Sequence, residues 1–283
     1  MKKQIILLLL LMPFVWATAQ TPNQVRLVIR ADDIGFSHSA NRACMQVYEE
    51  GIARTVEIMV PTPWYPEAVR LLSQAPGYDV GIHLTLTSEW ENMKWRPLTH
   101  APSLTDSNGY FFPMIWDNER FAPGQTLRGA PWKLAEVEAE LRAQIETAKQ
   151  HLPRLSHLTA HMGCSEMDPE VSALVKRLAA EYGLGQSPPM QRLPWKTSSP
   201  ENTSKQARAF ANMLKTLTPG TYLLVCHPGL DEAEMQAIGH SGYYHVAQER
   251  SAETRLLTHP QVKKAVKQLG IELVSYAQVM SEP

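Results

Sequence analysis

VRLVIRADDIG, residues 25–35, is the stretch from which the fold can be worked out. Its apolar start runs into two adjacent carboxylates, Asp32 and Asp33, followed closely by Gly35. This pattern predicts a buried parallel strand that carries both acids at its carboxyl end. Neighbouring carboxylates repel each other, and a divalent metal removes that conflict if one acid binds the ion while the other faces the reacting atoms. The alternative is a strand-to-loop turn in which Asp33 caps the next helix.

The composition is that of an ordinary globular protein. The chain has 283 residues, which suits one large domain or two small ones, and 44% of them are hydrophobic. A formal net charge of -1 gives no electrostatic case for nucleic-acid binding. The three cysteines, Cys44, Cys164 and Cys226, match no zinc motif and allow at most one disulfide. A pairing of Cys164 with Cys226 is left open, because each lies near a motif described below.

The first residues have the features of a secretory signal peptide. Two lysines precede an apolar run over residues 5–16, and a small-x-small cleavage site follows at 17–19. Cleavage there divides the chain into a signal peptide, 1–19, and a mature domain, 20–283. The alternative is an uncleaved membrane anchor, for which the apolar run is short. We therefore expect an exported protein, periplasmic or secreted, without a membrane attachment after cleavage.

Strand and helix patterns alternate along the rest of the chain. Strands are predicted at 55–60, 79–87, 155–161, 220–226 and 271–274, and helices at 40–50, 66–74, 134–152, 169–183, 205–217, 246–257 and 261–269. Such an alternation predicts parallel β-α units with right-handed crossovers, which is an α/β fold.

Three segments interrupt this alternation. Residues 88–133 and 187–204 are predicted to be long loops, and 231–244 is predicted to be irregular and to face the same rim. The first segment holds four tryptophans and is typical of a lid or a binding loop. Its aromatic side chains either stack on sugar rings or pack the segment onto the body of the protein.

Four predicted strands end in residues that can bind a metal or move a proton. Asp32 and Asp33 end the first strand, and His83, His161 and His227 end three others. Because the carboxyl ends of parallel strands meet at one edge, we expect these side chains to converge. One carboxylate and two neutral imidazoles leave open positions on a divalent ion, which activates water and polarises a carbonyl. With the other aspartate as base and a further histidine as acid, this is a hydrolytic site for an amide or ester.

These residues also resemble the YdjC-like carbohydrate deacetylases, a family that includes chitooligosaccharide deacetylases. The matching motifs follow one another along most of the mature chain, at 31–35, 81–87, 156–161, 226–229 and 250–253. The resemblance implies a single-domain fold, a distorted parallel (β/α) barrel similar to a TIM barrel. It also implies roles for single residues: Asp33, His83 and His161 as metal ligands, Asp32 as general base, and His227 as the acid or as a stabiliser of the tetrahedral intermediate.

Two features of the motifs leave questions open. By the resemblance, Arg250 orients the base or contacts the substrate; the alternative is a surface ion pair with Glu253. Residues 159–165 depart from the family's pattern, so the sugar recognised elsewhere in the family need not be recognised here. His157 has the same side-chain type as His161, but we expect it to lie deeper on the same strand.

The sequence leads to one main hypothesis and two rivals. The main one is an exported, metal-dependent hydrolase that removes N-acetyl groups from amino sugars or oligosaccharides, such as chitooligosaccharides. The same site is also suited to another acylated glycan or a lipid-linked sugar, since the loops set specificity. The rival from a different class is an exported glycan-binding protein that has lost catalysis. The ligand set suits zinc; cobalt, nickel, manganese and iron also fit, and magnesium is less natural with two imidazoles.

Overall fold

The computed structural model describes residues 24–75, 77–119, 124–195 and 202–282. The predicted signal peptide, residues 1–19, lies outside this described part of the chain. Among the described residues, no helix combines the length and the apolar character that crossing a membrane requires.

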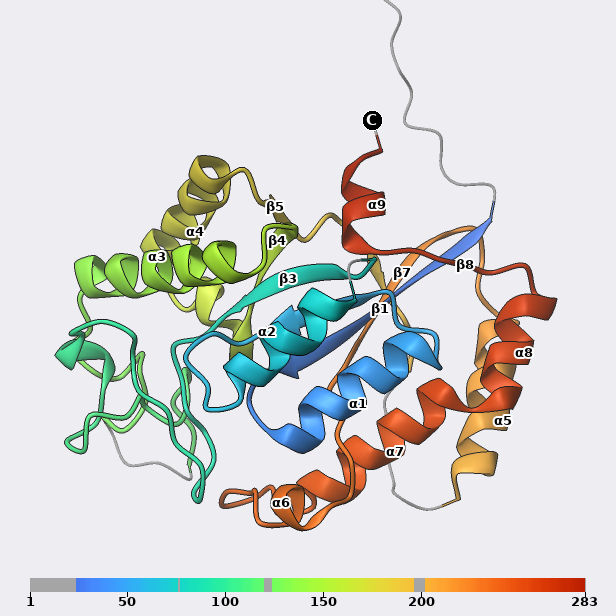
Figure 1. The fold of residues 1–283 in the computed structure, drawn as a ribbon, viewed down its shortest axis with the longest axis horizontal. Helices are drawn as coiled ribbons and strands as arrows, with labels where there is room; N and C mark the ends of the chain where they lie inside the picture. Colours follow the sequence, from blue (N-terminus) through green and yellow to red (C-terminus); the bar gives the residue numbers. More distant parts are fainter. Residues whose placement is uncertain (1–23, 76, 120–123, 196–201, 283) are drawn as a thin grey trace, which may run out of the picture.

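A curled sheet of parallel strands forms the centre of the protein (Figure 1). Within the described residues its strands are β1 (Val25–Ile34), β2 (Thr55–Ile58), β3 (Asp79–Leu84), β4 (Leu155–Ala160), β5 (Gly185–Gln186), β6 (Gln191–Arg192), β7 (Gly220–Cys226) and β8 (Glu272–Leu273). Their order is β5-β4-β3-β2-β1-β7-β6, and β8 pairs with the start of β1. In the described part of the chain β5 and β6 do not pair with each other, so the sheet is an incomplete, distorted (β/α) barrel.

Helices surround the sheet, and some of them begin at a side-chain cap. They are α1 (His38–Glu49), α2 (Tyr65–Gln74), α3 (Leu134–His151), α4 (Pro169–Tyr182), α5 (Thr203–Leu214), α6 (Ala233–Gln236), α7 (Val246–Thr258), α8 (Pro260–Gln268) and α9 (Tyr276–Met280). Ser37 accepts a hydrogen bond from the backbone N–H of Ala40, and Asp168 accepts one from Glu170. Each cap satisfies a backbone donor that the first helical turn leaves unpaired.

The strands bury apolar side chains on one face and polar side chains on the other. In β2, Val56 and Ile58 belong to the hydrophobic core, whereas Glu57 between them is also fully buried. In β4, Leu158 joins the core while His157 and Thr159 alternate with it. Since successive side chains of a strand point to opposite faces, the aliphatic residues pack against the helices and the polar ones fill the barrel. A barrel interior is more often filled by Val, Ile and Leu.

Helix α9, which the sequence patterns did not predict, packs against the amino ends of the strands. The carboxylate of Asp79, at the start of β3, accepts a hydrogen bond from the backbone N–H of Ala277 at 3.1 Å. The Tyr276 ring stacks on His157 with ring centres 4.3 Å apart. The C-terminal segment therefore covers the end of the barrel opposite to the carboxyl ends of the strands.

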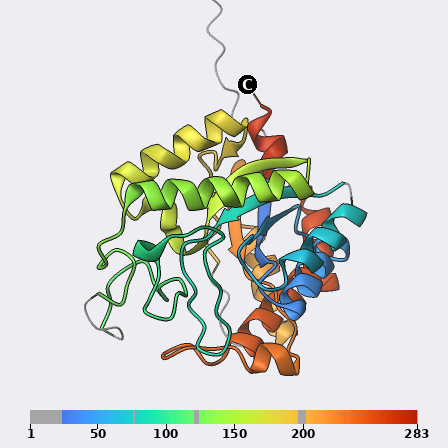
Figure 2. The same ribbon diagram turned by 60° about the vertical axis from the view of Figure 1, so that its left-hand side comes forward.

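The irregular segments contain more structure than predicted. The predicted loop 187–204 contributes the short strand β6, and its residues 196–201 lie outside the described part. The segment 231–244 contains α6. Segment 88–133 forms loops beside α3 (Figure 2), where Glu140 accepts hydrogen bonds from the backbone N–H groups of Leu98 and Thr99.

All three cysteines are buried and free, so the pairing of Cys164 with Cys226 is wrong. The Cys164 thiol donates to the carbonyl of Leu84 at 3.2 Å, and the Cys226 thiol donates to the carbonyl of Arg30 at 3.1 Å. Burial raises the pKa of the Cys164 thiol to about 12. These two thiols therefore stay protonated and donate hydrogen bonds to the backbone of β3 and β1.

Candidate metal centre

The two aspartates lie inside β1, near its end, and both reach the barrel interior. Asp33 has a φ of 73°, in the left-handed region that residues other than glycine rarely adopt. The pairing of β1 with β2 shifts register between Ala31 and Ile34, as at a β-bulge. This irregularity breaks the strict alternation of the strand, so that Asp32 and Asp33 both line the same cavity.

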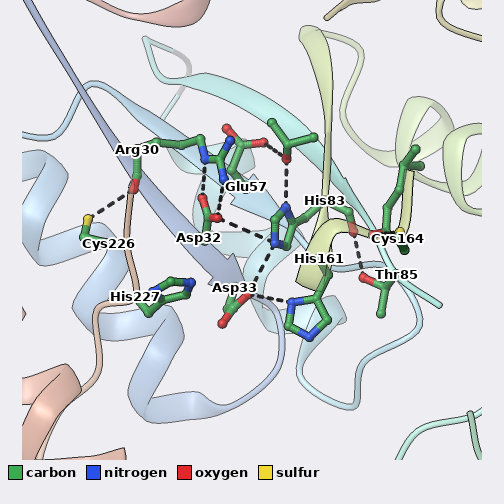
Figure 3. A network of polar contacts seen from close by, with 12 residues as sticks. Arg30, Asp32, Asp33, Glu57, His83, Thr85, His161, Cys164, Cys226 and His227 are labelled. Atoms are coloured by element: carbon green, nitrogen blue, oxygen red, sulfur yellow. Dashed lines mark hydrogen bonds and ion pairs between the residues drawn. The ribbon is translucent and has the colours of Figure 1, made fainter. Parts of the chain in front are cut away.

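Asp33, His83 and His161 form a buried group with the composition of a metal site (Figure 3). One ligand atom from each lies within 4.8 Å of the other two. Asp33 Oδ1 lies 3.5 Å from His83 Nε2 and 3.3 Å from His161 Nδ1. These distances match the roughly 3.3 Å between two atoms that bind one tetrahedral ion at about 2.0–2.1 Å. Asp33 Oδ1 is buried without a hydrogen-bond partner, so these residues fit a divalent cation.

His161 is held in place by a kink and by a carboxylate. It begins a short 3-10 turn, His161–Glu166, in which Met162 and Gly163 have positive φ angles of 50° and 71°. Its Nδ1 faces Asp33, and its Nε2 lies 3.1 Å from Glu89 Oε2. A carboxylate on the outer nitrogen of a metal-binding histidine is a common arrangement.

His83 is held from inside the barrel. Its Nδ1 lies 2.8 Å from the Thr159 hydroxyl, so its Nε2 faces the two aspartates. The Thr159 hydroxyl also bonds Glu57 Oε2 at 2.6 Å. Both ligand histidines therefore have a partner on the nitrogen that faces away from the aspartates.

Each aspartate has its own arginine, which changes the interpretation of the acid pair. Both oxygens of Asp32 accept hydrogen bonds from Arg30, at 2.6 and 2.7 Å. Asp33 Oδ2 accepts one from Arg250 Nη2 at 2.8 Å. The repulsion between the two carboxylates is thus offset by two guanidinium groups, and a metal ion is not the only group that can offset it.

The alternative role considered for Arg250, a surface ion pair with Glu253, is wrong. Arg250 is buried and pairs with Asp33, while Glu253 accepts a hydrogen bond from the backbone N–H of His227. Arg250 also lines the cavity, and its Nε and Nη1 atoms have no hydrogen-bond partner. Arg30, not Arg250, is the residue that binds Asp32.

Burial and the neighbouring charges push the pKa values of the acids in opposite directions. Burial favours the neutral form of Asp33, but the Arg250 guanidinium and His161 outweigh it and hold the pKa of Asp33 well below its usual range. For Asp32, burial outweighs the opposing effect of Arg30, so that the pKa of Asp32 is raised. Asp33 is therefore the acid with the stronger preference for the charged form.

The two histidines also differ in protonation. Burial is the largest effect on His83 and lowers its pKa well below the usual range. Burial acts the same way on His161, but Glu89 and Asp33 together outweigh it and raise the pKa of His161 to about 10. In the metal-free protein His83 is therefore neutral, whereas His161 carries a second proton.

A cavity of about 940 Å³ opens over these residues. His227 lines it and lies on the other side of the two aspartates from His83 and His161 (Figure 3). Trp90 and His240, which line it from the rim, stack with ring centres 5.5 Å apart. Of the rim tryptophans, Trp90 and Trp95 are only 2% and 3% exposed, so they pack the segment onto the body.

Sequence reasoning missed four residues that contact the aspartates or the ligand histidines directly or through a hydroxyl: Arg30, Glu57, Glu89 and Thr159. Two of them had a recognisable pattern, because Arg30 lies two positions before Asp32 on the same strand face and Glu57 interrupts an apolar strand. Glu89 stands in a segment without periodicity, where no pattern identifies it.

Comparisons with known proteins show which family the chain resembles in sequence. The sequence profile of the YdjC-like protein family matches residues 26–268. A carbohydrate deacetylase from Thermus thermophilus is 31% identical over 266 residues, covering 85% of this chain and 89% of the relative. A carbohydrate deacetylase from Geobacillus stearothermophilus is 27% identical, covering 88% of this chain and 96% of the relative.

Solved structures share the fold. An Enterococcus faecalis protein named for cellobiose-phosphate cleavage superposes with a TM-score of 0.70 at 21% identity, covering 90% of this chain and 99% of that one. A chitin deacetylase from Colletotrichum lindemuthianum gives a TM-score of 0.50 at 13% identity, covering 93% of this chain and 91% of that one. The distorted (β/α) barrel predicted from the sequence is confirmed.

Proposed function

This chain belongs to the YdjC-like protein family, and from that premise we propose that it is a metal-dependent hydrolase that removes N-acetyl groups from amino sugars or oligosaccharides. The observation that carries the proposal is the buried group of Asp33, His83 and His161 at the base of the cavity. The names of the two deacetylase relatives support the reaction class.

The proposed ligand set leaves room for a substrate. Asp33 contributes one oxygen, Oδ1, because its other oxygen is bound to Arg250. His83 and His161 contribute Nε2 and Nδ1. A divalent ion held by these residues, with zinc the best match to one oxygen and two nitrogens, would lower the pKa of water and polarise the acetyl carbonyl.

Asp32 is the proposed general base. Its Oδ2 lies 3.6 Å from His83 Nε2, which places the carboxylate beside the proposed ligands. Arg30 fixes the carboxylate through two hydrogen bonds, so its orientation does not depend on the substrate. The raised pKa of Asp32, which burial causes, moves it toward the range in which a carboxylate accepts a proton effectively at neutral pH.

His227 is the proposed acid, on the opposite side of the aspartates. The bond from its backbone N–H to Glu253 anchors the residue at the end of β7. Its ring lines the cavity, where it can give a proton to the leaving amine. Arg250 is the proposed substrate contact, supported by its place in the lining of the cavity.

Acetate release tests this function directly. Purified protein is incubated with acetylated chitooligosaccharides, with and without a chelator, and a panel of other acylated glycans and lipid-linked amino sugars serves to define the substrate. We expect acetate release that the chelator abolishes, that added zinc restores, and that His83→Ala lacks. Activity that survives both the chelator and His83→Ala contradicts the proposed mechanism; tight sugar binding by metal-loaded protein without acetate release contradicts catalysis.

Export is a further part of the proposal. It rests on the sequence of residues 1–19, which lie outside the described part of the chain. Determining the N-terminal sequence of the protein recovered from outside the cytoplasm tests it. We expect the mature chain to begin at Gln20; recovery of the uncleaved chain from the cytoplasm contradicts export.

A further inference from the structure

We propose that Thr159 and Glu57 are positioning residues that fix the tautomer of His83, so that its Nε2 is unprotonated and free to bind the metal. The inference rests on the proposed function, because it concerns the ligand set of that site. Neither residue touches the reacting atoms: Glu57 acts on Thr159, and Thr159 acts on the imidazole.

The three residues stand on adjacent strands at matched positions. Glu57 on β2 pairs in register with Gly81 on β3, and His83 on β3 pairs with Thr159 on β4. The hydroxyl of Thr159 lies 2.8 Å from His83 Nδ1 and 2.6 Å from Glu57 Oε2. All three side chains are buried, with Thr159 the most exposed at 8%. Backbone pairing therefore sets the arrangement, without any contribution from a loop.

The direction of the hydrogen bonds follows from the residue types. A carboxylate can only accept, so the single hydroxyl proton of Thr159 is donated to Glu57. The Thr159 oxygen then accepts from His83, which requires the proton of the neutral imidazole to be on Nδ1. His83 Nε2 then carries no proton, and it lies 3.5 Å from Asp33 Oδ1. This is the protonation state that a metal-binding histidine needs.

Two neighbours keep Glu57 Oε2 as the acceptor of this arrangement. Ser156 Oγ donates to Asp79 and so accepts from His157 Nδ1, which leaves any proton between His157 and Glu57 at the contact of Nε2 with Oε1. His157 Nε2 lies 2.8 Å from the other carboxylate oxygen, Oε1, and the Arg30 guanidinium interacts electrostatically with the same carboxylate. The opposite sequence, in which a protonated Glu57 donates to Thr159 and Thr159 donates to His83 Nδ1, places a proton on Nε2 instead. That tautomer cannot bind a metal through the nitrogen that faces Asp33.

The sequence of β3 leaves space for this carboxylate. A Cβ atom on Gly81 would lie 2.2 Å from Glu57 Oε2 and 2.4 Å from His157 Nε2. Any residue other than glycine at this position collides with the Glu57–His157 pair. Glycine at position 81 of β3 therefore makes room for the Glu57 carboxylate.

Two substitutions of Thr159 test the inference, with a matched control. Thr159→Val keeps the shape but removes the hydroxyl, and Thr159→Ser keeps the hydroxyl. Thr85→Val is the control, because Thr85 is also buried and its hydroxyl donates to the backbone carbonyl of His83 rather than to its ring. The ¹⁵N spectra of the histidines are recorded on metal-free proteins, with His83→Gln assigning the signal, and zinc affinity is measured by calorimetric titration.

We expect wild-type, Thr159→Ser and Thr85→Val proteins to show the Nδ1–H form of His83 and to bind zinc alike. Thr159→Val should mix the two tautomers and bind zinc about 10–100-fold more weakly. An Nε2–H form in the wild-type protein, or an unchanged tautomer in Thr159→Val, overturns the inference.

If the wild-type protein binds no zinc yet shows the Nδ1–H form, the proposed function fails and the positioning role stands. If Thr159→Val does not fold, the inference is tested by the His83 tautomer in the wild-type protein and in Glu57→Gln. We expect the Nδ1–H form in the wild type and a mixture of tautomers in Glu57→Gln.

Discussion

The two histidines proposed as metal ligands are supported from different regions of the molecule. Behind His83 the support is the barrel interior, where strand residues Thr159 and Glu57 are fixed by backbone pairing. Behind His161 the support is the rim, where Glu89 belongs to the long segment between β3 and α3. The first support is a neutral hydroxyl, and the second is a carboxylate. Burial keeps His83 neutral before any ion binds, whereas Glu89 and Asp33 hold a second proton on His161.

The two sides of the site therefore depend on different parts of the fold. The His83 side of the site is fixed once the sheet has formed. The His161 side also depends on segment 88–133, which is joined to the 237–244 rim by hydrogen bonds such as that from the Ser241 backbone N–H to Glu91. A change in the rim should thus alter metal binding through His161 before it affects His83.

The largest expected effect comes from the residue that both histidines share. Asp33→Asn should abolish zinc binding and turnover, and should lower the free energy of unfolding by about 1.5–3 kcal/mol, because Arg250 loses its charged partner. Asp32→Asn should retain zinc and lose turnover. Metal analysis and acetate release are measured for both variants. Equal loss of metal in the two variants contradicts the proposal that Asp33 binds the ion while Asp32 acts as the base.

The next effect concerns the proton on His161. Its pKa of about 10 lies above neutral pH, and an ion can bind Nδ1 only after that proton has left. Zinc affinity should therefore rise by about tenfold per pH unit between pH 7 and pH 9. Zinc titrations at several pH values, with a buffer of known metal affinity as reference, measure the slope. An affinity that does not change over this range contradicts the proposed difference between the two histidines.

The support from the rim can be weakened without changing its shape. Glu89→Gln keeps an acceptor for His161 Nε2 but removes the negative charge, so zinc affinity at high pH, where His161 has lost its second proton in both proteins, should fall by about tenfold. The pH slope should also become shallower, because the proton on His161 is no longer held by Glu89. Glu119→Gln, which neutralises an exposed carboxylate on the same segment, is the matched control.

The smallest effect is expected below the site, in the barrel interior. Tyr276→Phe keeps the stack on His157 but removes the hydroxyl that contacts Arg30 at 3.2 Å and Ser187 at 3.3 Å. The free energy of unfolding should fall by about 0.5–1.5 kcal/mol, with zinc affinity unchanged. Chemical denaturation and zinc titration test this. A large loss of zinc affinity would show that the metal ligands depend on contacts deep in the barrel interior.

The sequence was sufficient to place the proposed ligands because they occupy strand ends. Parallel strands bring their carboxyl ends together whatever their order, so Asp33, His83 and His161 could be expected to converge before the strand order was known. The buried partners were harder to find. Glu57 was visible only as a charge inside an apolar strand, and its contact with Thr159 depends on the register of three strands, which no local pattern specifies.

The remaining differences have similar physical causes. Glu89 reaches His161 through a segment without periodicity, where contacts are set by tertiary packing. The bulge at Asp33 contains one positive φ angle, and a positive φ angle at a residue other than glycine cannot be predicted from the sequence pattern. Helix α9 is only five residues long and has a capping box at Ser275, too short a pattern to be separated from a loop.

The pairing of each aspartate with its own arginine has a consequence for how the protein matures. Because Arg30 and Arg250 already neutralise the two carboxylates, we expect the barrel to fold without an ion, and refolding in a chelator to regain the native circular dichroism spectrum. If the chain is exported as proposed, the proposed metal ion would bind to a cavity that has already folded. The choice among competing ions would be made by the shape of the folded pocket, not by whichever ion first encounters the nascent polypeptide.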